Sequence, residues 1–385
     1  MGLFSHRKTG RAAGILHEAQ QAREKGDFPA AERLGRRAAG LYAEAVGSGA
    51  HQTAAAEALV GAVVHAQGRG EEAERGLRAA LAVAGLTADG EVLLRADLAN
   101  VLRKEGRYQE AVQEIRTALA LRGKSELRLS VRQSCALLLG ELGQHREAAE
   151  QFAALVADTG RGTPQMRTFA AAMESNLLTQ LIYLGEHAEA DRLVAGIRER
   201  AATGWEPEAT LTRVSAANSR ALSLCLRGRH AEAEELLRQG LAAGPSREQF
   251  VQILNVNLVR ALLGQGRVEE AGQALDTALA AAGKLPAPSD HDRSSLGLAT
   301  ANLRLAQGDA AGAGAAAREG LALCPPSRKP THRALELRTA LGTAETRQGR
   351  GTDTLTAALA DWEEHFGPAH HGAAAARDAL AAPAG

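Results

Sequence analysis

Apolar residues recur three or four positions apart along most of the chain, and turn residues interrupt this pattern at regular intervals. Leu98 and Leu102 show the spacing, as do Leu258 and Leu262, and it places side chains on one face of a helix. We find no run in which apolar and polar residues alternate at period two, as they do in half-buried strands. The pattern predicts an all-α protein.

A recurring glycine separates two helices in each unit of the pattern. Five positions after the glycine comes alanine, as in Gly106 and Ala111. Glycine accepts the positive φ that ends a helix, and the small alanine lets the second helix approach the first. The last two copies of the motif are the weakest. The nine predicted hairpin glycines are Gly26, Gly68, Gly106, Gly143, Gly185, Gly228, Gly266, Gly308 and Gly349.

Nine copies of this motif, between about residues 10 and 362, resemble the tetratricopeptide repeat family. The basic unit of that family has about 34 residues, whereas the glycines here are spaced by roughly 37 to 43 residues. The longer spacing resembles arrays of the kinesin-light-chain type, and it is also similar to the sensor arrays attached to bacterial transcription regulators. The resemblance implies a right-handed superhelical solenoid, with first helices lining a concave groove and second helices forming the outer wall. In the family, such grooves hold peptides or the tails of partner proteins.

The domain organisation follows from where the repeats begin and end. We expect residues 1–9 to form a flexible basic arm and residues 10–366 to form one continuous array of nine hairpins. Gly367 and Pro368 break the helical pattern. Residues 367–385 then read as a capping helix and tail, since a terminal repeat needs a polar outer face.

Asparagine marks the expected groove. All six asparagines of the chain fall in first helices, and five of them lie at offsets from the next hairpin glycine that share one helical stripe. An amide offers a donor and an acceptor, so it can pair with the backbone of an extended peptide. Arg260 is a candidate partner for a carboxylate. The predicted peptide-binding residues are Asn100, Ser175, Asn176, Thr179, Asn218, Asn257, Arg260 and Asn302. The alternative is that these asparagines are solvated or pack between repeats.

Composition narrows the classes of partner. Basic and acidic residues are equal at 45 each, whereas nucleic-acid binders usually carry a basic excess. No segment is apolar enough for a membrane span or a secretory signal. The three cysteines have no metal-ligand spacing, and an odd number argues against a disulfide framework. We therefore expect a cytoplasmic protein with no direct contact to nucleic acid or membrane.

The sequence offers no convincing catalytic or metal site. There is no glycine-rich phosphate loop after a strand and no nucleophile elbow. His365, His370 and His371 could in principle bind a metal with Glu363 and Glu364, but the Gly367-Pro368 break interrupts them. Three more histidines, His145, His187 and His230, occupy the hairpin position that holds Phe28 and Tyr108 in other repeats, which favours a structural role. No catalytic residue, metal or cofactor is predicted.

The leading hypothesis is a non-catalytic adaptor that binds an extended peptide or a protein tail in its groove. One alternative is a signal-peptide sensor or regulator that acts through a separate effector, because only about ten residues precede the first repeat. Another is a scaffold that self-associates into a homo-oligomer.

Overall fold

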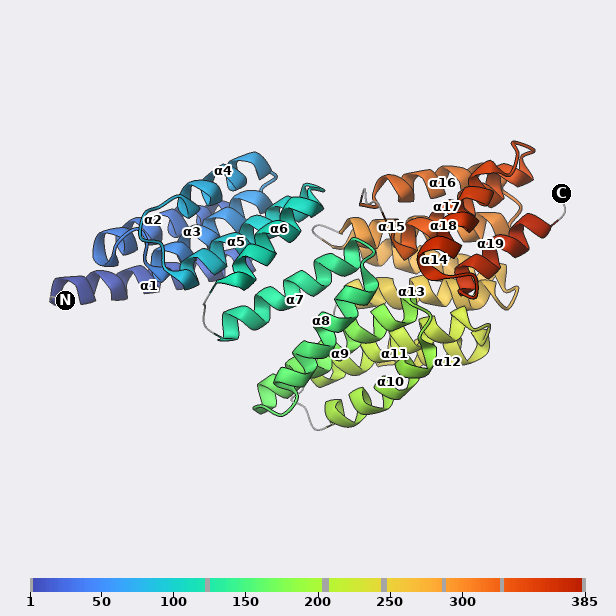
Figure 1. Cartoon of the computed structure of the whole chain (residues 1–385), viewed down its shortest axis with the longest axis horizontal. Helices are drawn as coiled ribbons and strands as arrows, with labels where there is room; N and C mark the ends of the chain where they lie inside the picture. Colours follow the sequence, from blue (N-terminus) through green and yellow to red (C-terminus); the bar gives the residue numbers. More distant parts are fainter. Residues whose placement is uncertain are drawn as a thin grey trace. The chain divides into compact units, whose positions relative to one another are not determined.

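The computed structural model describes residues 3–121, 125–202, 208–243, 248–285, 289–325 and 329–382. Within these ranges the chain forms helices and no strand, and successive helices pair into hairpins (Figure 1). The all-α repeat fold expected from the sequence is confirmed. The helices are α1 (Leu3–Glu24), α2 (Phe28–Val46), α3 (His51–Ala66), α4 (Gly70–Leu81), α5 (Ala88–Lys104), α6 (Tyr108–Ala120), α7 (Ser125–Glu141), α8 (His145–Thr159), α9 (Pro164–Tyr183), α10 (His187–Ala202), α11 (Glu208–Leu226), α12 (His230–Ala242), α13 (Glu248–Leu263), α14 (Val268–Gly283), α15 (Asp290–Ala306), α16 (Ala310–Ala322), α17 (His332–Arg347), α18 (Asp353–Phe366) and α19 (His371–Ala381).

All nine predicted hairpin glycines lie between the two helices of a pair. Each has a positive φ, between 70° and 81°, a region that side chains other than glycine rarely adopt. The chain therefore reverses at the predicted positions. The last helix, α19, begins at His371, within the segment where the sequence predicts a capping helix.

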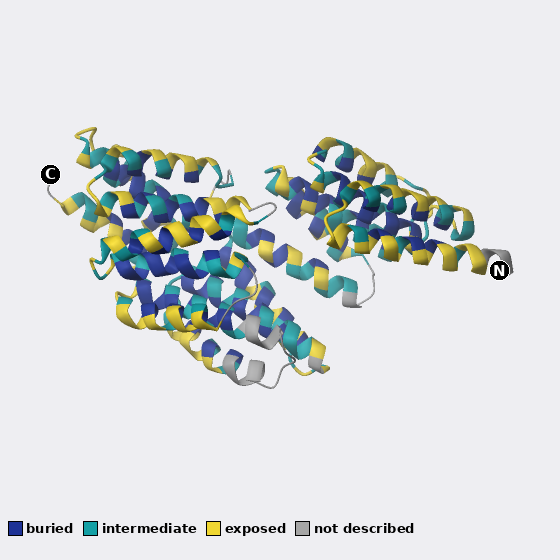
Figure 2. Ribbon diagram, turned by 180° about the vertical axis from the view of Figure 1, so that it is seen from behind, coloured by how far each residue is buried: buried dark blue, intermediate teal, exposed yellow. Residues whose placement is uncertain are grey.

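The alanine five positions after each of the first eight hairpin glycines is buried, at 2% exposure or less. It sits at the contact between the paired helices, where the close approach needs a small side chain. Figure 2 shows buried residues along the packed helix faces of each unit, with exposed residues outside them. These alanines are Ala31, Ala73, Ala111, Ala148, Ala190, Ala233, Ala271 and Ala313.

Enlarging one of these alanines should be costly. Ala233→Leu is expected to lower the free energy of unfolding by ~1–3 kcal/mol, because added methylenes in a packed contact force neighbours apart. Ala231→Leu, at an exposed position of the same helix, is the matched control. Urea unfolding followed by circular dichroism measures both, and equal midpoints would contradict a tight contact at Ala233.

Ion pairs join successive repeats on the side of the second helices. Arg267 follows a hairpin glycine and pairs at 2.6 Å both with Glu270 of its own hairpin and with Glu234 of the preceding second helix. Arg69 repeats the arrangement with Glu32 at 2.7 Å. These side chains are partly solvated, so each pair contributes little to stability.

The chain divides into two compact units, residues 1–139 and 140–385, whereas the sequence predicts one continuous array. In both units the first helices of successive repeats contact one another, as α3 contacts α5 and α13 contacts α15. First helices therefore form the inner face of each unit.

The beginning of the chain differs from expectation. The sequence predicts that residues 3–9 belong to a flexible arm, but α1 already starts at Leu3 and runs to Glu24. No glycine or proline interrupts this segment before Gly10, and glycine inside a helix costs only ~1 kcal/mol. Among the described residues, none of the helices has the length and apolar character to span a bilayer.

Candidate functional site

The first and last repeats of the second unit contact each other. His370, at the start of α19, donates from Nε2 to the carbonyl oxygen of Tyr183 at the end of α9, at 3.0 Å. The rings of His145 and Phe366 have centroids 5.9 Å apart. A Cβ on Gly143 would lie 3.1 Å from the Cα of Thr331, so the backbones also approach closely. The solenoid of this unit therefore closes on itself.

Six rings from α9, α17, α18 and α19 make this closing contact, and we call them the closing cluster. Tyr183 stacks on His332 with centroids 4.7 Å apart, and Trp362 stacks on His370 at 5.0 Å. Trp362 is buried and donates from Nε1 to Thr339 Oγ1 at 3.1 Å. The members of the closing cluster are Tyr183, His332, Trp362, Phe366, His370 and His371.

Burial keeps the histidines of this region neutral. Desolvation, together with the neighbouring His332, lowers the pKa of His370 to about 4 and that of His371 to about 2. Desolvation also lowers the pKa of His145 to about 4, although its hydrogen bond to Gln180 opposes the shift. At neutral pH these imidazoles carry no charge and act as neutral donors and acceptors.

An ion pair crosses the inner face beside the closing cluster. Arg260 of α13 and Glu336 of α17 approach to 2.7 Å, with side chains 23% and 13% exposed. Burial alone would raise the pKa of Glu336, but the charges of Arg260 and Arg333 and the proximity of His332 hold it well below its ordinary value. The carboxylate that the sequence leads us to expect on Arg260 is thus supplied by the chain itself.

A pocket of about 300 Å³ opens on this inner face, between α11, α13, α15, α17, α18 and α19. Its volume is at the lower end of the range for ligand pockets, ~300–1,000 Å³. Two of the predicted groove residues, Arg260 and Asn302, line it, together with Glu336, Trp362 and His371.

The structure brings further stripe residues together in pairs across neighbouring first helices. Asn257 of α13 donates from Nδ2 to Oδ1 of Asn218 of α11 at 3.0 Å. The hydroxyls of Thr179 on α9 and Ser219 on α11 are 3.2 Å apart. The stripe is therefore continuous from α9 to α13, and much of its polarity is used between repeats.

Of the remaining predicted residues, Ser175 joins this network through its backbone, whose carbonyl accepts from Thr179 Oγ1 at 3.1 Å. Ser175 is buried and donates to the carbonyl of Ala171 in its own helix. Asn176 lies half-buried on α9. Asn100 belongs to the first unit, where it is exposed and accepts from Arg103 at 3.1 Å. Whether any of them contacts a ligand stays a prediction.

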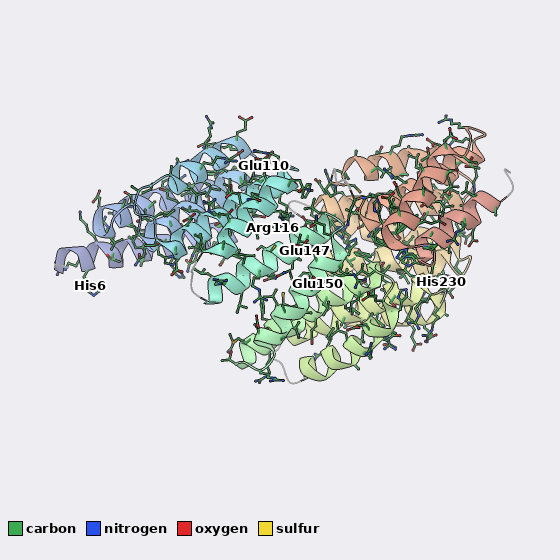
Figure 3. The ribbon with its side chains drawn as sticks, in the orientation of Figure 1. His6, Glu110, Arg116, Glu147, Glu150 and His230 are labelled. Carbon is green, nitrogen blue, oxygen red and sulfur yellow. The ribbon has the colours of Figure 1, made fainter. Side chains whose placement is uncertain are left out.

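The hairpin histidines contact the first helix of the next repeat, as a structural role requires. His145 Nδ1 is 2.8 Å from Gln180 Oε1, and His187 Nδ1 is 2.9 Å from Ser223 Oγ. The ring of His230, labelled in Figure 3, lies against Gly264, where a Cβ would be 2.4 Å away.

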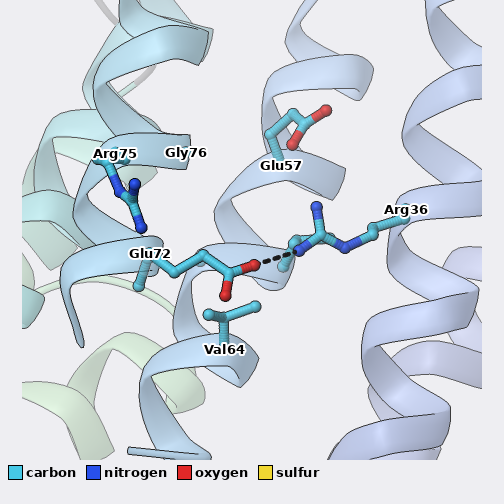
Figure 4. Close-up of a pocket in the computed structure, with 9 residues that line it drawn as sticks. Arg36, Glu57, Val64, Glu72, Arg75 and Gly76 are labelled. Atoms are coloured by element: carbon cyan, nitrogen blue, oxygen red, sulfur yellow. Dashed lines mark hydrogen bonds and ion pairs between the residues drawn. The ribbon is translucent and has the colours of Figure 1, made fainter. Parts of the chain in front are cut away.

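Two other pockets are less suited to a specific ligand. One, of about 420 Å³, lies between α2, α3 and α4 in the first unit (Figure 4). There Arg36 and Glu72 are 3.1 Å apart, and burial raises the pKa of Glu57. The other, of about 450 Å³, includes Glu147 and Glu150 of α8 (Figure 3). Neither contains a residue of the asparagine stripe.

Comparison with known proteins identifies the fold. No family model matches the chain, and no curated protein matches it. Among solved structures, Rap protein complexed with Competence and Sporulation Factor aligns at a TM-score of 0.57, with 16% identity over 97% of both chains. NprR in complex with its cognate peptide NprX aligns at 0.58, with 12% identity over 92% of this chain and 98% of that one. The apo form of the quorum sensor NprR from B. thuringiensis gives 0.54, with 11% identity over 96% and 99%.

The helical hairpins, their glycine and alanine positions and these similarities define the chain as a helical-repeat protein with a tetratricopeptide-like fold. At 16% identity or less, the similarity concerns the fold alone.

Sequence reasoning misses five residues of this region, Tyr183, His332, Glu336, Trp362 and Phe366. Glu336 and Trp362 belong to the last two-helix repeat, and His332 directly follows Thr331, whose hydroxyl caps α17 by accepting from Ala334 N at 3.0 Å. The only signal is a proline-rich junction before a helix, and such a junction predicts where α17 begins. It carries no information about which distant repeat α17 contacts.

Proposed function

We propose that the protein is a non-catalytic binding protein that takes an extended peptide or protein tail into the inner-face pocket of its second unit. The observation that carries this proposal is that residues of the predicted asparagine stripe line the pocket or lie on the helices that form it. Asn302 and Arg260 line it, and the pair Asn218 and Asn257 lies on the adjoining helices α11 and α13.

The chemistry of the amide pair suits a peptide backbone. The bond between Asn257 and Asn218 uses one Nδ2 hydrogen of the first and Oδ1 of the second. The NH₂ group of Asn218 and Oδ1 of Asn257 are not consumed by it, so a donor and an acceptor remain. A peptide unit in extended conformation offers the complementary groups whatever its side chains.

The charge balance of the pocket favours a ligand that binds mainly through its backbone. Arg260 is already neutralised by Glu336, so a ligand carboxylate would have to compete with a preformed pair. Cys225, also in the wall, has its pKa raised to about 11 by burial, which keeps it a protonated and weakly nucleophilic thiol. Both features support binding over covalent chemistry.

The similarity to NprR supports the regulatory version of this proposal. That protein is described as a quorum sensor and is seen with a cognate peptide. A sensor of this kind would report occupancy of its pocket to a separate effector protein.

The test compares binding by pocket variants. Asn257→Ala with Asn302→Ala is expected to weaken ligand affinity about tenfold or more, since two backbone hydrogen bonds at ~1 kcal/mol each are lost. The ligand is first obtained by affinity capture from the native lysate and mass spectrometry, and its synthetic peptide is then titrated by calorimetry.

Asn100→Ala is the matched control, because it makes the same change at a stripe position of the other unit. It should leave affinity unchanged. If the double variant keeps wild-type affinity and normal helicity by circular dichroism, the inner-face pocket is not the binding site.

A further inference from the structure

Three histidines of the closing cluster place nitrogen donors close together. His332 is the first residue of α17, His370 is the N-cap of α19, and His371 begins that helix. One ring nitrogen from each lies within 4.8 Å of the others. The Nε2 atoms of His332 and His371 are 3.0 Å apart, close to the separation of two ligands on a tetrahedral ion with metal–nitrogen distances of ~2.0–2.1 Å.

One of these two rings has an unused polar atom. Nδ1 of His371 is buried and has no hydrogen-bond partner. His332 is 1% exposed. The two Nε2 atoms share at most one proton between them in the absence of an ion. A metal ion bound to both Nε2 atoms would place the proton of each ring on Nδ1, which in His332 faces Glu336.

A carboxylate lies near Nδ1 of His332, the ring nitrogen that faces away from the proposed ion. Glu336 Oε2 is 3.4 Å from Nδ1 of His332. Carboxylates placed on the far nitrogen of a metal-binding histidine orient the ring and raise its basicity. Glu336 also pairs with Arg260 and Arg333, and its carboxylate offsets part of their repulsion of a cation.

His370 can join through Nδ1. Its Nε2 proton is held by the Tyr183 carbonyl, so the lone pair lies on Nδ1, where it accepts from the backbone amide of Gly372 at 3.1 Å. A metal ion would take this lone pair in place of the Gly372 amide. The hydrogen bond from Nε2 to a backbone carbonyl is a common partner of metal-binding histidine.

We propose that His332, His370 and His371 form a binding site for a divalent transition-metal ion that prefers imidazole, such as zinc, with an open coordination position facing the pocket. His371 lines that pocket, so the ion would be accessible to a bound ligand. The sequence groups His370 and His371 with His365, across a break that argues against a site. The turn at Gly367 brings them instead against His332, at the start of α17.

The test is titration of the purified full-length chain, stripped with chelator, with zinc chloride in a calorimeter at neutral pH. One equivalent is expected to bind and to raise the Tm. His332→Ala and His371→Ala should each weaken binding ~10–100-fold or more. His230→Ala, a hairpin histidine of another repeat, is the matched control and should bind as wild type.

A second group of side chains could also bind the zinc ion, and variants distinguish the two sites. Asp361, Glu364 and His365 also lie within 4.8 Å of one another through their ligand atoms. Loss of zinc binding in His365→Ala with normal binding in His371→Ala would overturn the proposal, as would the absence of binding to the wild-type chain.

A second measurement avoids variants that fail to fold. Zinc is added to wild-type protein with ¹⁵N-labelled histidine. Shifts of the His332 and His371 ring nitrogens are expected, and unmoved signals at those rings would refute the site. This result does not depend on peptide binding.

Discussion

Replacing Glu336 with glutamine is expected to lower the free energy of unfolding of the second unit by ~3–5 kcal/mol. The change leaves Arg260 as a charge on a largely buried inner face, without the carboxylate 2.7 Å away. Breaking a buried ion pair on one side costs this much, because the remaining charge keeps its desolvation penalty and loses its compensation. Chemical unfolding followed by circular dichroism measures the change.

Two companion variants test the cause. Glu189→Gln makes the same substitution in an exposed pair with Arg192, where the distance is 3.6 Å, and should change stability by less than ~1 kcal/mol. Arg260→Met combined with Glu336→Leu removes both charges and should recover most of the loss. If Glu336→Gln and Glu189→Gln behaved alike, the pair would not be buried in solution.

Lowering the pH from 7 to 4.5 is expected to destabilise the second unit more than any single surface change. His145 and His370 have folded-state pKa values of about 4, and His371 of about 2, all depressed by burial. In the unfolded chain a histidine titrates near pH ~6.5. Between these values the unfolded state binds more protons, so stability is full above pH ~6.5 and falls as the pH drops toward ~4.

Thermal unfolding of chelator-treated protein at several pH values measures this loss. His145→Gln removes one of the titrating groups and should reduce the slope of stability against pH by up to one proton, or ~1.4 kcal/mol per pH unit. His17→Gln, exposed on α1, is the control. Glu336, with its pKa held well below the ordinary value, stays ionised in this window and does not produce the effect. A Tm that is constant from pH 7 to 4.5 would contradict neutral burial of these rings.

The repeat fold is predictable because its determinants are local. Gly185 and Ala190 are five positions apart, and the conformation of one and the volume of the other fix a hairpin without reference to the rest of the chain. The position of α19 follows in the same way from the Gly367-Pro368 break.

The site is predictable only in part, because its closure depends on distant residues. Helical spacing places Asn218 and Asn257 on one face, but nothing in it shows that their amides bond to each other. The partner of Arg260 lies on α17, four helices further along the chain, at Glu336, and no periodic pattern connects the two. The rotation from each hairpin to the next accumulates along the chain and decides which distant repeats contact each other. Small differences in the loops between repeats change this rotation.

The contact between His370 and Tyr183 also changes how the second unit folds. A linear repeat array unfolds piecewise from its ends, because each unit contacts only its neighbours. Here a hydrogen bond joins residues 187 positions apart, and the terminal helix is fastened to the beginning of its own unit. Such a long-range contact slows folding, since a large loop must close before it forms, and it couples the ends into one cooperative transition. Fraying of α19, which in an open array would be a local event, would here release the closing cluster and uncover the pocket at the same time.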